Sequence, residues 1–132
     1  MMTSFDTVWS EFIVKNKMDE FDIPNTDEAI HRTIESAVRT FNTKLEDDLT
    51  CDVSTELFGR ELNDEEINLL SHIIRLTTLQ NQLIYQSTMF IPFTQDIGTR
   101  NHANQMTRLE KLVEDEEKKI NSILLKMVDE LW

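Results

Sequence analysis

Residues that make tight turns are scarce in this chain, and this scarcity constrains its fold more than any other feature. The 132 residues include only two glycines and two prolines. An all-β sandwich or barrel needs turn chemistry about every 8–12 residues, which so few turn formers cannot supply. Leu, Ile, Glu, Asp, Lys and Met dominate instead, and most of these residues favour helix. The sequence therefore predicts an all-α fold.

Apolar residues at spacings of three and four predict four helices. The first follows a Ser4 cap and includes residues 5–13, the second runs from residues 25–28 to about residue 44, the third from residues 63–66 to about residue 87, and the last from residues 100–103 to residue 131. Asn63 and Glu66 form a capping-box pattern, so the third helix has the clearest start. Its apolar residues cover more than one stripe, which predicts contacts on several sides. We expect a bundle of about four helices with a long third and a long C-terminal helix.

The segments between the later helices are less regular. Residues 46–62 are an acidic connection that allows a short helical turn over residues 54–58. Residues 89–98 contain Pro92, which disfavours helix, yet they are rich in apolar side chains, so we expect this loop to meet a partner surface. The last helix would be about 45 Å long, too long for a globule with a radius of gyration of about 14 Å. Part of it is therefore expected to pack on another chain.

The length and the cysteine content indicate one domain over residues 1–132 with a core that needs no disulfide. Acids surround the lone Cys51, so we expect an ordinary thiol and synthesis in a reducing cytosol. The sequence has no apolar run of about 18 residues, and its first residues lack the pattern of a signal peptide. Neither a membrane span nor export by that route is expected.

The chain is strongly acidic, with 25 acids against 13 bases and a formal net charge of −12. The imbalance lies in the first half, because residues 1–66 hold 17 acids and 6 bases, whereas residues 67–132 hold 8 acids and 7 bases. Lys and Arg supply most nucleic-acid affinity, so specific binding of DNA is not expected.

The usual catalytic motifs are missing from the sequence. It contains no Gly-rich phosphate loop, no paired CxxC, no HExxH and no nucleophile elbow. We therefore expect no enzymatic activity, no cofactor and no metal.

Three weaker patterns suggest metal sites, and each of them is disfavoured. The acids of residues 46–52 resemble a calcium loop but lack the glycine and glutamate of an EF-hand. Glu28 and His31 form a Glu-x-x-His pair, whereas a di-iron or di-manganese bundle needs a second pair. Acids of the last helix would have to converge to hold magnesium in a nucleotide pyrophosphohydrolase, but consecutive acids point around a helix, so residues 114–119 are expected to be a solvated stretch. These acids are Glu114, Asp115, Glu116, Glu117 and Asp129.

Three stretches resemble the head–tail connector (adaptor or neck) proteins of tailed bacteriophages. They are the opening residues 4–12, the acid-capped start of the third helix at residues 62–70, and residues 93–97 leading into residues 101–106. The resemblance implies a helical subunit in a ring, typically twelvefold, docked beneath the portal protein in the neck of the virion. Such a ring extends the DNA channel and joins the head to the next neck, stopper or tail protein, and DNA passes through it without specific binding.

The resemblance also implies two sets of site residues. A partner-binding set, for the portal or a neighbouring subunit, comprises Met89, Phe90, Ile91, Phe93, Ile97, Met127, Leu131 and Trp132. Trp132 either packs on its own helix or anchors the chain in a partner pocket. Acids that border a channel would repel DNA and keep it from sticking. The channel-facing acids are expected among Glu46, Asp47, Asp48 and Asp52.

The acidic first half supports an alternative function. A small acidic phage-encoded interaction or inhibitor protein, which mimics DNA or binds a host factor, would be a monomer or dimer absent from virions. The connector and the interaction protein both act by binding other proteins, and they differ in whether the protein is part of the particle.

Overall fold

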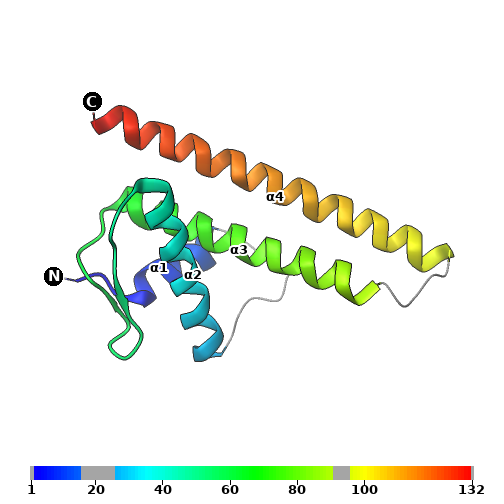
Figure 1. Ribbon diagram of the computed structural model, residues 1–132, viewed down its shortest axis with the longest axis horizontal. Coiled ribbons are helices and arrows are strands. Elements are labelled where there is room, and N and C mark those ends of the chain that lie inside the picture. Colours follow the sequence, from blue (N-terminus) through cyan, green and yellow to red (C-terminus); the bar gives the residue numbers. More distant parts are fainter. Residues whose placement is uncertain (1, 16–25, 91–95, 132) are drawn as a thin grey trace.

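The structure is a computed structural model, and it describes residues 2–15, 26–90 and 96–131. Within these ranges the elements are α1 (Phe5–Lys15), α2 (Asp27–Leu45), β1 (Cys51–Asp52), β2 (Leu57–Phe58), α3 (Asp64–Phe90) and α4 (Asp96–Leu131). Figure 1 shows α1, α2 and the β1–β2 hairpin gathered around the N-terminal half of α3, while α4 runs antiparallel beside α3 and extends past it. The chain is mostly helical, as predicted.

Side-chain caps begin three of the helices. The Thr7 amide donates to Ser4 Oγ at the start of α1, and the Ala29 amide donates to Thr26 Oγ1 at the start of α2. The predicted capping box of α3 is confirmed, because Asn63 Oδ1 accepts from the Glu66 amide at 2.8 Å and Glu66 Oε1 accepts from the Asn63 amide at 3.1 Å. The cap of α2 is Thr26, within the start predicted at residues 25–28.

The centre of the core is α3, which packs against α1, α2 and α4. Its buried apolar side chains lie on several faces, so the prediction of a helix contacted on more than one side is confirmed. Phe12 of α1, Phe41 of α2 and Ile120 of α4 are buried against it. The buried apolar residues of α3 are Leu69, Leu70, Ile73, Ile74, Leu76 and Leu79.

The helical turn that the sequence allows at residues 54–58 does not form, because this segment belongs to a β-hairpin in which β1 and β2 pair antiparallel. The Asp52 carboxylate accepts hydrogen bonds from the amide and hydroxyl of Ser54, and Glu56 takes a left-handed φ of 56°, which together turn the chain. The N-terminal segment adds a bridge between Ser4 and Leu57. A small two-stranded sheet therefore accompanies the helices, and the expectation of a purely helical chain needs this correction.

The ends of the two long helices also differ from expectation. α3 continues to Phe90 instead of stopping near residue 87, and α4 begins at Asp96 instead of residues 100–103. Gly98 therefore lies inside the first turn of α4, and the expected loop over residues 89–98 is shorter than predicted. At 1.5 Å per residue the 36 residues of α4 are about 54 Å long. No helix in the described part of the chain is long and apolar enough to cross a membrane.

Candidate functional site

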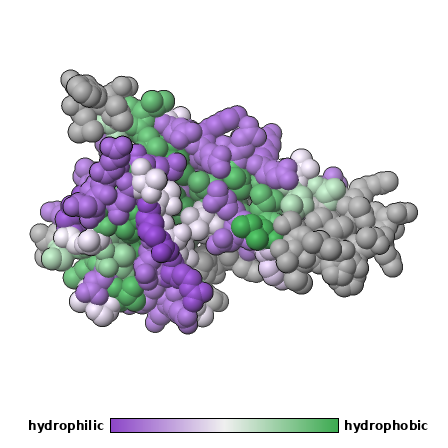
Figure 2. All heavy atoms as spheres, in the orientation of Figure 1, coloured by the Kyte–Doolittle hydropathy of each residue, from purple (hydrophilic) through white to green (hydrophobic). Residues whose placement is uncertain are grey.

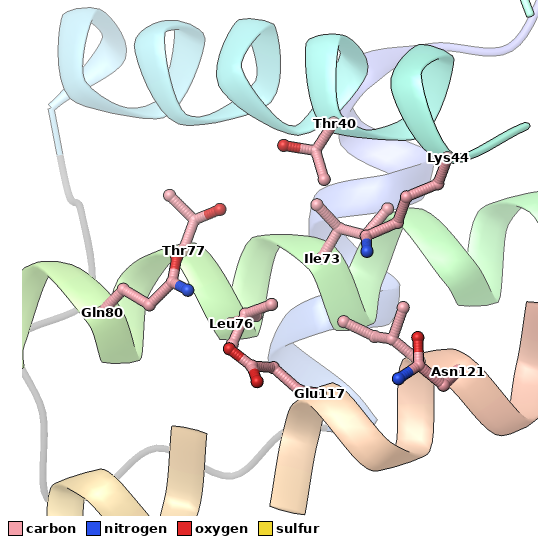
Figure 3. Close-up of a pocket in the computed structure, with 9 residues that line it drawn as sticks. Thr40, Lys44, Ile73, Leu76, Thr77, Gln80, Glu117 and Asn121 are labelled. Atoms are coloured by element: carbon pink, nitrogen blue, oxygen red, sulfur yellow. The ribbon is translucent and has the colours of Figure 1, made fainter. Parts of the chain in front are cut away.

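A recess of about 340 Å³ opens between α2 and α4, with α3 beneath it, and is called the α3 groove below (Figure 3). Its floor is apolar and buried, from Ile73 and Leu76 of α3 and Ile120 of α4. The remaining lining residues are polar: Thr40, Lys44, Thr77, Gln80, Glu117 and Asn121. The volume is at the lower end of the range for small-ligand pockets and suits one or two large side chains of a partner.

Most polar groups of the α3 groove have no hydrogen-bond partner among the described residues. Thr40 is the exception, since its hydroxyl donates to the Ser36 carbonyl at 3.2 Å. Lys44, Gln80, Glu117 and Asn121 are all exposed. Figure 3 shows Lys44 reaching into the groove from α2 and Glu117 reaching into it from α4. An ammonium and a carboxylate therefore lie on opposite sides of an apolar floor, available to an incoming partner.

The α2 side of the groove is basic, although the whole chain is acidic. A second hollow of about 280 Å³ is lined by Arg39, Thr40, Thr43 and Lys44, and it shares Thr40 and Lys44 with the α3 groove. Lys44 lies in the last turn of α2, where the helix dipole favours a cation. The surface along the end of α2 thus presents two cations beside the groove.

A buried ionic cluster fixes the α4 side of the groove. His72 and Glu116 are 4% and 6% exposed, and Nδ1 of His72 lies 2.7 Å from Oε1 of Glu116. The other carboxylate oxygen of Glu116 accepts from Nε of Arg75 at 3.1 Å. Sequence reasoning missed this cluster and treated residues 114–119 as a solvated stretch. That expectation is wrong for Glu116, because His72 and Arg75 of α3 supply its partners.

The predicted partner-binding residues lie apart from the α3 groove or outside the description. Ile91, Phe93 and Trp132 lie outside the described residues. Met89 and Phe90 belong to α3, and Ile97 and Leu131 belong to α4, but their side chains are outside the description. Met127 is half-buried and packs against the core. A partner-binding role for this set stays a prediction.

The four predicted channel acids have varied surroundings. Asp47 pairs with Arg60 at 2.8 Å, and its pKa is lowered by a hydrogen bond from the Asp48 amide and by Arg60. Hydrogen bonds from the side chain and amide of Ser54 lower the pKa of Asp52. Glu46 and Asp48 are exposed, and Glu46 caps α2 in a left-handed conformation. Whether these acids face DNA stays a prediction.

The three patterns weighed as metal sites gain no support from the geometry. Glu28 pairs with Arg32 at 2.7 Å, whereas His31 Nε2 lies 3.2 Å from Glu56, so the two members of the Glu-x-x-His pattern have separate partners. Glu114, Asp115 and Glu117 are exposed, Glu116 is buried, and the Asp129 side chain lies outside the description. Among the described residues, no three His, Cys, Asp or Glu side chains are grouped to hold a metal.

Cys51 is half-buried beside the hairpin. Burial, followed by the nearby Glu35 carboxylate, raises the pKa of its thiol. The sequence predicts an ordinary thiol among acids, and the raised pKa agrees with a thiol that is not activated, although burial contributes more than the acids. A hollow of about 640 Å³ borders Cys51, with exposed Met2 and Val53 in its lining.

Comparison with known proteins identifies what this chain is similar to. The family model of the YomZ prophage protein matches residues 2–129. The SPbeta prophage-derived uncharacterized protein YomZ of Bacillus subtilis (strain 168) is 34% identical over 124 residues, which cover 94% of this chain and 95% of that protein. No solved structure matches the chain.

These matches correct the resemblance to head–tail connectors, which is wrong as a family assignment. The matching family is a prophage protein family, and its model covers almost the whole chain. The origin from a bacteriophage is thereby confirmed. The connector stretches depended on caps and acids, which occur at the starts of many helices.

Proposed function

Because the chain belongs to the YomZ prophage protein family, we propose that it is a prophage-encoded interaction protein that acts by binding another protein on the open side of α3. The observation that carries the proposal is the α3 groove, where a buried apolar floor is surrounded by exposed polar groups. Interfaces between proteins combine these features, a water-excluding centre and a polar rim.

The chemistry of the groove favours binding over catalysis. Glu117 is the single acid in its lining, and no His or Cys lies among the lining residues to act with it as a base or nucleophile. Gln80 and Asn121 each offer an amide that can both donate and accept hydrogen bonds. A lining of this kind recognises a partner surface and lacks the paired groups that proton transfer requires.

The experiment is photo-crosslinking from the groove in cells that carry the prophage. The photoreactive residue p-benzoylphenylalanine is placed at Gln80, an exposed position of the groove, and in a matched control at Lys119, an exposed position of α4 outside the lining. We expect a discrete adduct from position 80 and none from position 119, before or after induction. If position 80 gives no adduct under either condition, or both positions give the same one, the proposal fails.

The location in the virion neck and the twelvefold ring stay predictions. Both depended on the resemblance to connectors, which the family match replaces. Mass spectrometry of purified particles tests the location independently, because a neck protein is present at a fixed number of copies per particle, whereas an interaction protein of the host cell is absent.

A further inference from the structure

One face of α3 leads from the buried floor of the α3 groove to an exposed residue near the C-terminal end of the helix. Ile73, Thr77, Gln80 and Ile84 follow one another at spacings of four, three and four, so they share this face. The first three line the α3 groove, and Ile84 lies beyond it with 63% of its surface exposed. Figure 1 shows that α1 and α2 lie beside the N-terminal half of α3, whereas Ile84 belongs to the C-terminal half. The groove and Ile84 together are called the α3 face.

Apolar surface is also exposed on the side of the molecule that Figure 2 displays. Figure 2 shows apolar patches between hydrophilic surfaces in the part of the chain that extends beyond α1 and α2. An isoleucine exposed to this extent gains from contact with another apolar group. Ile84 therefore offers apolar surface to a partner at the end of the α3 face.

The two sides of the α3 face carry opposite charges. Lys44 of α2 lies on one side and Glu117 of α4 on the other, and both reach into the groove (Figure 3). Neither side chain forms an ion pair with another residue in the described part of the chain. A partner must therefore place an acid over the α2 side and a base over the α4 side.

A second copy of this chain meets both requirements, and we infer that the α3 face is the interface of a two-fold dimer. If the two-fold axis runs along α3 between the two copies, rotation brings the α2 side of one copy over the α4 side of the other. Each Lys44 then faces Glu117 of the other copy, and the two Ile84 side chains meet at the axis. This inference rests on the proposed function, since it names the partner of the same surface.

The charges also select the direction of the axis. A two-fold axis perpendicular to α3 within the interface would place Lys44 against Lys44 and Glu117 against Glu117, and like charges in contact oppose binding. The interface with the axis along α3 is self-complementary and closes with two copies, unlike the contacts of a ring. Each copy has a net charge of −12, so the dimer must form against general repulsion.

Sedimentation equilibrium of the purified full-length protein tests the inference, in about 0.1 M salt to shorten the range of the general repulsion. We expect reversible association to twice the monomer mass of 15.5 kDa. Lys44→Glu and Glu117→Lys should each weaken it at least about tenfold. Ile84→Asp should do the same, because it places two acids at the axis. All three positions are exposed, and circular dichroism checks that the variants fold.

A mixture of the two single-charge variants gives the decisive result. In a mixed dimer the Glu at position 44 of one copy faces the Lys at position 117 of the other, and the second pair is native, so mixing should restore the dimer. The double variant Lys44→Glu with Glu117→Lys should also dimerise. A protein that stays monomeric to about 100 µM overturns the inference. Failure of the mixture to associate does the same.

The crosslinking experiment separates this inference from the proposed function. An adduct from position 80 with twice the mass of the chain supports both. An adduct with a different protein, together with a monomer in solution, overturns the dimer and leaves the proposed function standing. The lack of any adduct from position 80 overturns the proposed function itself.

Discussion

Nδ1 of His72 lies 2.7 Å from Oε1 of Glu116, and this bond joins α3 to α4 inside the protein. The tautomer of His72 decides which of the two atoms donates. Nε of Arg75 donates to the second oxygen of the same carboxylate at 3.1 Å. Glu116 directly precedes Glu117 in α4, so the cluster that fixes Glu116 also fixes how Glu117 enters the α3 groove.

Removal of the Glu116 carboxylate should strongly destabilise the protein. Glu116→Ala leaves buried His72 and half-buried Arg75 without their acceptor, which costs about 2–4 kcal/mol in the free energy of unfolding. Urea denaturation measures the loss. The matched control is Glu114→Ala, since Glu114 makes an exposed pair with Lys118 and its loss should cost no more than about 0.5 kcal/mol. Equal losses of unfolding free energy in the two variants would show that the buried cluster stabilises the protein no more than the exposed pair does.

The helices could be predicted from the sequence because their signals are local. Asn63 and Glu66 lie three residues apart, and the capping box that they form depends on no other part of the chain. The hairpin was missed because its strands have only two residues each. In addition, Leu57 of β2 forms a bridge with Ser4, which is far away in the sequence. Pairing of this kind depends on packing of the whole chain, which no short window contains.

The groove and the ionic cluster were beyond prediction for a similar reason. His72 and Glu116 are 44 residues apart, so nothing near either residue marks the pair. One signal was present, because Glu116 lies three residues after Val113 and four before Ile120 and thus occupies the apolar stripe of α4. The groove depends on how α2 and α4 diverge over α3, and helical periodicity does not determine that arrangement.

The Asn63 cap should contribute measurably to stability through its side chain. Asn63→Ala removes the acceptor of the Glu66 amide and should lower the free energy of unfolding by about 1 kcal/mol. Asn63→Gly should cost only a few tenths of a kcal/mol, since glycine is itself tolerated at this position. Chemical denaturation of the two variants measures the difference. If Asn63→Ala leaves the free energy of unfolding unchanged, the side-chain cap contributes nothing to stability.

Glu46 is a site for stabilisation, because it takes a left-handed conformation with φ 52° at the end of α2. In the left-handed conformation a Cβ lies too close to the following carbonyl oxygen, and glycine avoids this steric strain. Glu46→Gly should therefore raise the free energy of unfolding by about 0.5–1 kcal/mol. Thermal unfolding monitored by circular dichroism measures the change. Asp48→Gly, two residues later and not among the left-handed positions of the described chain, should instead destabilise the protein.

Cys51 should react slowly with thiol reagents. Burial raises the pKa of its thiol, so the fraction of reactive thiolate at pH 8 is smaller than for a free cysteine. We expect the reaction with Ellman's reagent to be at least about tenfold faster after unfolding in urea than in the native protein. The same reaction of glutathione in both solutions corrects for the effect of urea. A native rate equal to the unfolded rate would mean that the thiol is exposed.

Asp47 should make stability depend on acidic pH. The Asp48 amide donates to Oδ1 at 2.7 Å and Nη2 of Arg60 donates to Oδ2 at 2.8 Å, and the amide lowers the pKa of Asp47 most. Its pKa in the folded protein therefore lies below the reference value of 3.8. The contribution to stability is then complete at neutral pH and is lost as the pH falls from about 3.8 through the folded pKa.

Comparison with Asp47→Asn isolates this contribution from the other acids that titrate in the same range. At pH 7 the variant should be less stable by no more than about 1 kcal/mol, because the side chain is partly exposed. The difference should shrink as the pH falls below 3.8. Arg60→Gln in the wild-type background should keep part of the pH dependence, since the Asp48 amide remains in place. Urea denaturation from pH 7 to pH 3 measures the unfolding free energies. If the difference between the wild type and Asp47→Asn grows on acidification, the pKa of Asp47 is raised instead of lowered.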